Sequence, residues 1–191
     1  MSPVFSKIDF TVICWLIFVL VWIISAFWVK PSKERQSRKS RLAALVFLAI
    51  IFLLLSGSVG IHKLNAPIFR VMAASRFTGD AFTLVGLFIA IWARLCLGRN
   101  WSGTVSFKQD HELIEHGPYR FVRHPIYTGM LLMVLGTAVS SGRLSALLAL
   151  VFFSFGIWKK LRREETLLTK YFPDAYPRYM SHTKALIPFV L

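Results

Sequence analysis

The chain has 191 residues, of which 55% are hydrophobic and 17% are charged, and its mean hydropathy is +0.58. A soluble domain carries about 25% charged residues, whereas this chain contains 20-residue runs without a charge at positions 10–29 and 42–61. Each run can cross roughly 30 Å of bilayer hydrocarbon as a helix. These features exclude a disordered chain, a secreted disulfide scaffold and a soluble nucleic-acid-binding domain. They predict a small polytopic integral membrane protein.

The formal net charge of +14 is distributed unevenly along the chain. Of the 23 Lys and Arg residues, 18 fall within residues 30–41, 94–123 and 159–184, and 5 fall in the remaining segments. Positive charge marks the cytoplasmic side of a membrane protein, so the pattern predicts an N-terminus outside and a C-terminus inside. The basic side would face anionic head groups, which indicates membrane lipids as partners and no nucleic acid.

Three spans are predicted in the first half of the chain, residues 1–98. They are the uncharged runs at 10–29 and 42–61 and the apolar residues 81–98. Within the third, Arg94 can extend its guanidinium toward the inner interface. We therefore assign residues 1–98 to an N-terminal transmembrane region.

Two further spans are predicted in the second half, residues 99–191. Residues 125–142 and 144–158 are uncharged, and the turn residues between them indicate a helical hairpin. The second of these helices continues into a polar segment until Pro173 and Pro177 interrupt it. The expected fold is all-α, with five transmembrane helices, a cytosolic loop before the hairpin and a C-terminal helix.

The cytosolic loop is rich in groups that can bind a ligand. It holds His111, His116 and His124, but their spacing matches no common metal motif and thiol ligands are absent, so no metal is expected. Pro125 can occupy the first turn of the next helix. His124, directly before it, either caps that helix or lines a ligand site.

One acidic residue falls on an apolar face of the last helix. The apolar stripe consists of Trp158, Leu161, Leu168 and Phe172. Glu165 completes the stripe, and a carboxylate that faces an apolar interior needs a cation or donor opposite. Arg123 or Arg163 could form a structural ion pair with it, or a ligand amine could bind it. We favour the ligand, because ionisable groups inside membrane proteins are often functional; the neighbouring Glu164 is interpreted as solvated.

These motifs together resemble a known signature. Residues 123–129, an apolar hairpin and the acidic pair at 164–165 are similar to the RHPxYxG-hydrophobic-EE pattern. That pattern is typical of the isoprenylcysteine carboxyl methyltransferases and their phospholipid methyltransferase relatives. The similarity extends to residues 98–103, 111–114 and 172–176, so that it covers about half of the chain, while the first two spans match in character only.

The resemblance implies an S-adenosylmethionine-dependent membrane methyltransferase whose cofactor binds on the cytosolic side, and it makes residues 99–191 the catalytic region. Cofactor contacts are implied in the loop, at the start of the hairpin and at the acidic pair. The matching residues are His111, Glu112, Leu113, Ile114, Tyr119, His124, Pro125, Ile126, Tyr127, Glu164 and Glu165. An arginine that would hold the methyl acceptor matches either Arg162 or Arg163.

The implied chemistry suits these residues. A carboxylate acceptor is already an anion and needs no general base, so positioning and desolvation carry most of the catalysis. The preferred acceptor is the carboxylate of an isoprenylcysteine-like or other lipophilic molecule, such as a prenylated substrate. Three alternatives remain open: a phospholipid amine N-methyltransferase, an NADPH-dependent membrane reductase and a non-enzymatic membrane adaptor. In the first of these, His124 or Glu165 would have to take a proton from the amine. The reductase is weakened because no glycine-rich dinucleotide loop is evident, and the adaptor leaves Glu165 unexplained.

Overall fold

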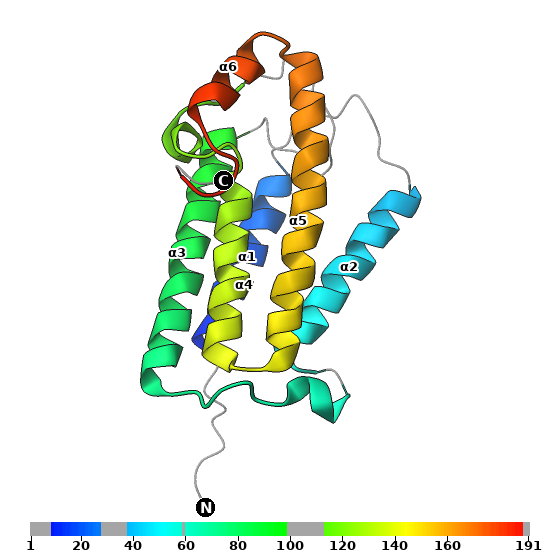
Figure 1. Ribbon diagram of the computed structural model, residues 1–191, viewed down its shortest axis with the longest axis vertical. Helices are drawn as coiled ribbons and strands as arrows, with labels where there is room; N and C mark the ends of the chain where they lie inside the picture. The colour runs from blue at the N-terminus through cyan, green and yellow to red at the C-terminus, as the bar shows by residue number, and fades with distance from the viewer. Residues whose placement is uncertain (1–8, 28–37, 59, 99–112, 189–191) are drawn as a thin grey trace, which may run out of the picture.

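The computed structural model describes residues 9–27, 38–58, 60–98 and 113–188. Five long helices form a bundle, and a shorter sixth helix crosses one end of it (Figure 1). The α-helices are α1 (Phe10–Ala26), α2 (Arg38–Ser56), α3 (Ala73–Leu97), α4 (Pro125–Ser141), α5 (Leu144–Tyr171) and α6 (Ala175–His182). Single 3-10 turns, η1 (His62–Asn65) and η3 (Gly117–Arg120), precede α3 and α4. The described residues contain no β-strand, so the all-α prediction is confirmed.

The outer surface of the bundle is apolar. Large hydrophobic side chains on α1, α2 and α3 are exposed, such as Leu16 (62%), Leu45 (64%) and Phe88 (64%). Apolar surface of this extent is unfavourable in water and indicates contact with lipid. Helices α3 and α5 are long and apolar enough to cross a membrane, whereas α1, α4 and the apolar part of α2 are shorter. The count of five spans therefore stays a prediction.

Helices α3 and α4 approach each other most closely through paired glycines. A Cβ atom added at Gly86 would lie 2.5 Å from the carbonyl oxygen of Gly129. One added at Gly79 would lie 2.6 Å from the carbonyl oxygen of Gly136. Small residues allow helix backbones to pack this tightly inside a membrane. This contact fixes the position of α4, whose first turn carries the candidate site.

Arg143, in the turn between α4 and α5, ties α2 to this hairpin. Its guanidinium donates hydrogen bonds to the carbonyl oxygens of Leu55 (2.8 Å) and Ser56 (3.1 Å) in the last turn of α2. A cation is favourable there because the unpaired carbonyls of a helix C-terminus carry partial negative charge. The segment before α3 crosses the same turn, where the Ile68 N–H donates to the Gly142 oxygen at 2.8 Å. These contacts close one end of the bundle.

The segment after α6, residues 183–186, binds along the chain that leads into α4, and we name it the C-terminal strap. The bonds are Arg123 N–H to Lys184 O (2.8 Å), His124 N–H to Ala185 O (3.0 Å) and Thr128 Oγ1–H to Leu186 O (2.7 Å). Backbone N–H groups at a helix start need partners outside the helix. The strap supplies them and so fixes the backbone at the entrance to α4.

The prolines after α5 behave differently from each other. Helix α5 ends at Tyr171, so Pro173 follows its end as predicted. Pro177 does not break a helix, because it occupies the first turn of α6. A missing N–H costs nothing in a first turn, where no intrahelical bond would form.

The orientation of the bundle stays a prediction, and labelling tests it. In a background without Cys14 and Cys96, a cysteine at Ser181 should react with an impermeant maleimide from the cytoplasmic side alone. A cysteine at Ser58 should react from the outside alone. Both serines are exposed, and α6, which carries Ser181, lies at the opposite end of the bundle from the C-terminal end of α2, which Ser58 follows (Figure 1). The reverse pattern at both positions would overturn the orientation and, with it, a cytosolic site.

Candidate functional site

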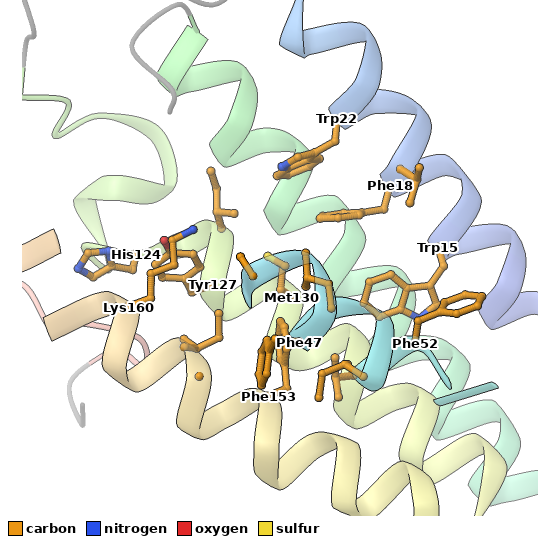
Figure 2. Close-up of a pocket in the computed structure, with 18 of the residues that line it drawn as sticks. Trp15, Phe18, Trp22, Phe47, Phe52, His124, Tyr127, Met130, Phe153 and Lys160 are labelled. Atoms are coloured by element: carbon orange, nitrogen blue, oxygen red, sulfur yellow. The ribbon is translucent and has the colours of Figure 1, made fainter. Parts of the chain in front are cut away.

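A cavity of about 1520 Å³ lies among α1, α2, α4 and α5. Pockets for one small molecule occupy about 300–1,000 Å³, so this cavity can hold two molecules. Figure 2 shows His124, Tyr127 and Lys160 at one end and Trp15 at the other, with Met130 between them. We name the group of lining residues around His124 and Glu164 the polar end. It consists of Arg123, His124, Tyr127, Lys160, Arg163 and Glu164.

The His124 side chain faces the acidic pair of α5. His124 is the N-cap residue of α4 and Pro125 follows as the first helical residue, where its fixed φ suits the helix. The imidazole makes no capping hydrogen bond. Instead Nδ1 lies 3.7 Å from Glu164 Oε2 and Nε2 lies 3.5 Å from Glu165 Oε1. The ring also stacks on Tyr127, with centroids 5.6 Å apart, so His124 caps the helix through its backbone alone.

Glu164 faces the cavity, and its interpretation as a solvated residue is wrong. Its Oε1 accepts a hydrogen bond of 2.6 Å from the Tyr127 hydroxyl, and 21% of its side chain is exposed. A hydrogen bond to an ionised carboxylate is short and strong, so Tyr127 orients this acid. Lys160 lies one helical turn before Glu164 and places its Nζ 5.4 Å from the centroid of the Tyr127 ring. The sequence analysis missed Lys160, although residues four apart share a helix face.

Glu165 pairs with Arg123, one of the two structural partners that the sequence allowed. Arg123 Nε and Nη2 lie 2.9 Å and 2.8 Å from Glu165 Oε1, and the two side chains are 10% and 12% exposed. Arg123 also donates to the carbonyl oxygen of Thr183 in the C-terminal strap. Glu165 is absent from the cavity lining. Its cofactor contact therefore stays a prediction, while its ion pair is observed.

The two candidate arginines for the acceptor point in different directions. Arg163 lines the cavity. Arg162 lies on the outer side of α5, where its guanidinium carbon is 4.6 Å from the centre of the Trp158 ring. Trp158 is 40% exposed, so its place on the buried stripe is wrong, whereas Leu161 is buried as expected. The geometry therefore favours Arg163 as the acceptor residue.

The end of the loop and the first turn of α4 complete the polar end. His111 and Glu112 lie outside the described residues. The other loop and helix residues that the resemblance implies are Leu113, Ile114, Tyr119 and Ile126, and all four line the cavity. Pro125 is buried behind them and shapes the helix start.

Three buried tyrosines surround this region. Burial is the main cause that raises the pKa of the Tyr119, Tyr176 and Tyr179 hydroxyls well above the ordinary value for tyrosine. The nearby Glu165 carboxylate raises the pKa of Tyr176 further. The Tyr179 hydroxyl donates to the main-chain oxygen of Tyr119. These hydroxyls stay protonated at physiological pH, so they can donate hydrogen bonds but cannot act as general bases.

The fold and the site together define an all-helical membrane protein in which a charged pocket opens into an apolar cavity. The chain belongs to the phospholipid methyltransferase family, whose sequence model matches residues 74–175. The family resemblance read from the motif is therefore confirmed.

The chain is also similar to individual proteins. It is 31% identical over 115 residues to the protein-S-isoprenylcysteine O-methyltransferase of Schizosaccharomyces pombe, covering 57% of this chain and 48% of the relative. It is 30% identical over 120 residues to a probable protein-S-isoprenylcysteine O-methyltransferase of Oryza sativa subsp. indica, covering 60% and 61%. The chain thus spans about half to three-fifths of the length of these relatives.

A solved structure shares the fold. It is that of the eukaryotic intramembrane Ras methyltransferase ICMT (isoprenylcysteine carboxyl methyltransferase). The TM-score is 0.58 at 20% identity, and the match covers 97% of this chain and 70% of that one. At this identity the likeness establishes the helical architecture and no more.

Proposed function

We propose that this protein is a membrane methyltransferase that uses S-adenosylmethionine to methylate the carboxylate of an isoprenylcysteine-like or other lipophilic acceptor. The observation that carries the proposal is the continuity of one cavity, which joins the charged polar end to an apolar interior. A reaction between a polar cofactor and the head of a lipophilic molecule requires such a junction. The names of the relatives support the same chemistry.

The residues of the polar end fit the cofactor. Bound there, S-adenosylmethionine would supply a methyl group on a positively charged sulfonium. Glu164, oriented by the Tyr127 hydroxyl, offers a carboxylate to a cationic amino group. The Tyr127 ring, on which His124 stacks, offers an aromatic face that attracts positive charge. Leu113 and Ile114 supply apolar contacts for the adenine ring of the cofactor.

The same end can hold an anionic acceptor. Arg163 and Lys160 bring two cations to the cavity from α5, and charge-assisted bonds from such groups bind carboxylates well. A carboxylate needs no general base, and the nearby tyrosines Tyr119 and Tyr176 could not supply one. The apolar lining excludes water and so strengthens these electrostatic contacts. The chain itself contributes binding, orientation and desolvation.

A phospholipid amine is the second candidate acceptor, because the matching family is described as phospholipid methyltransferase. An amine must lose a proton, and His124 beside Glu164 would have to take it. The cations Lys160 and Arg163 disfavour a protonated amine in the same place. We would incubate purified protein with methyl-labelled S-adenosylmethionine and either N-acetyl-S-farnesylcysteine or phosphatidylethanolamine. Label released by mild base identifies a methyl ester, and base-stable label on the phospholipid would contradict carboxylate methylation.

His124 provides a test of the cofactor pocket. His124→Ala should weaken S-adenosylhomocysteine binding by more than about tenfold, equivalent to roughly 1.4 kcal/mol, because it removes the ring that stacks on Tyr127. Calorimetry of the purified variant measures the change. The control is His182→Ala, a histidine exposed on α6. Unchanged affinity in a folded His124→Ala protein would leave His124 with its backbone role alone.

Substitution of the two neighbouring arginines of α5 tests the acceptor site, with one variant as the control for the other. Arg163→Met should raise the KM for N-acetyl-S-farnesylcysteine by about tenfold, the loss of one charged contact. Arg162→Met should leave KM unchanged, because Arg162 lies over Trp158 outside the cavity. Affinity for S-adenosylhomocysteine should be the same in both variants. Equal KM values in the two variants would remove Arg163 from the acceptor site.

A further inference from the structure

A fixed side chain projects into the cavity at the end remote from His124. Trp15 of α1 donates a hydrogen bond of 3.1 Å from Nε1 to the Thr137 hydroxyl oxygen of α4. Its ring also packs edge-on against Phe18, with centroids 5.7 Å apart. Figure 2 shows Trp15 directed into the cavity at the end opposite His124. A large ring held by a hydrogen bond and an aromatic contact forms a rigid wall.

The lining changes character at this wall. Between Trp15 and the polar end it is apolar, with contributions from Phe47, Met130, Val134 and Phe153. Beyond Trp15 and Thr137 polar groups join the lining, namely Asp9, Ser56, Ser140, Ser141 and Arg143, beside the apolar Val12 and Leu55. A hydrocarbon gains free energy by contact with apolar surface and gains little against polar groups. The apolar surface available to a hydrocarbon chain therefore ends at Trp15, both because the ring is in the way and because polar groups follow it.

The distance between the polar end and the wall follows from α4. Tyr127 and Thr137 both lie on this helix, and a separation of ten residues corresponds to a rise of about 15 Å. This length is about half of the roughly 30 Å thickness of bilayer hydrocarbon. The apolar part of the cavity thus matches a chain that would fill one leaflet.

We propose that Trp15, held by Thr137, limits the length of the hydrocarbon chain that the acceptor can bury. The inference rests on the proposed function, because it assumes a lipophilic acceptor with its head at the polar end. Acceptors whose hydrocarbon chain ends before the Trp15 ring bind more tightly with each added isoprene unit. Longer chains gain none, since their further carbons meet the Trp15 ring and the polar lining behind it.

The test compares N-acetylcysteine carrying geranyl, farnesyl or geranylgeranyl chains on its sulfur, which contain two, three and four isoprene units. Binding to the full chain is measured by calorimetry in one detergent with S-adenosylhomocysteine present, so that partition of each probe into micelles is common to all proteins. In wild type, affinity should increase by about tenfold from geranyl to farnesyl. It should change by less than about twofold from farnesyl to geranylgeranyl.

Variants of the wall give the decisive comparison. Trp15→Ala should raise the ratio of geranylgeranyl to farnesyl affinity by about fivefold or more, because the space that the indole ring vacates can take a further isoprene unit. Trp15→Phe retains a ring without the N–H donor, and should raise the ratio less while it preserves packing. Trp92→Ala is the control, since Trp92 lies on α3 outside this cavity and is 40% exposed. Its ratio should equal that of wild type.

Two results would overturn the length limit while leaving the proposed function intact. One is a wild-type affinity that still rises from farnesyl to geranylgeranyl. The other is an unchanged ratio in a Trp15 variant that binds S-adenosylhomocysteine normally; if Trp15→Ala does not fold, Trp15→Phe decides. Failure of all three probes to bind, with S-adenosylhomocysteine bound, would instead refute the lipophilic acceptor and the length limit together.

Discussion

Replacing Glu165 with glutamine is expected to lower the free energy of unfolding by about 3–5 kcal/mol. The change removes the carboxylate that lies 2.8 Å from Arg123 Nη2 and leaves a guanidinium that is 10% exposed without its counter-charge. The remaining contact of Arg123 with the Thr183 oxygen offers a dipole in place of a full negative charge. Unfolding of the detergent-solubilised protein without ligand measures the loss.

Two further variants separate the ion pair from other effects. Glu164→Gln should cost less than about 1.5 kcal/mol, because the neutral Tyr127 hydroxyl can still donate to the amide oxygen. Combining Arg123→Met with Glu165→Met should recover most of the stability, since an apolar pair replaces both charges. Unchanged stability of Glu165→Gln together with lost S-adenosylhomocysteine binding would show that the carboxylate serves the cofactor instead.

Adding a single methyl group at Gly86 is expected to destabilise the bundle by about 3 kcal/mol or more. In Gly86→Ala the new Cβ would lie 2.5 Å from the Gly129 oxygen and 2.8 Å from the Met133 nitrogen. Both are backbone atoms of α4, so no side chain can move aside and the helices must separate. The matched control is Gly60→Ala, where a Cβ meets nothing within 4 Å. Melting temperatures within a degree of each other for the two variants would show that the interface adjusts.

The helices were predictable because their signals are local. Uncharged runs marked α1 and α2, Pro125 marked the start of α4, and the stripe on α5 placed Glu165 inside. Each of these signals lies within one element. They could not select Arg123 over Arg163 as the partner of Glu165, because that choice depends on how α5 packs against a segment far away in the sequence.

Other parts of the site left no periodic signal. The interpretation of Glu164 as solvated failed because its partner, the Tyr127 hydroxyl, comes from another helix. Trp158 was assigned to the buried stripe by spacing, but a ring at a membrane interface can lie outward against Arg162 instead. The C-terminal strap forms hydrogen bonds with Arg123 and His124. Isolated bonds between distant segments have no repeat from which sequence reasoning could detect them.

The C-terminal strap also imposes an order on biogenesis. A ribosome delivers the N-terminal part of a chain first, so α1 to α5 can enter the membrane before residues 183–186 exist. Until then the N–H groups of Arg123 and His124 lack the strap carbonyls that hold them. In the order of synthesis, docking of residues 183–186 therefore follows the insertion of α1 to α5, and it completes the hydrogen bonds at the entrance to α4.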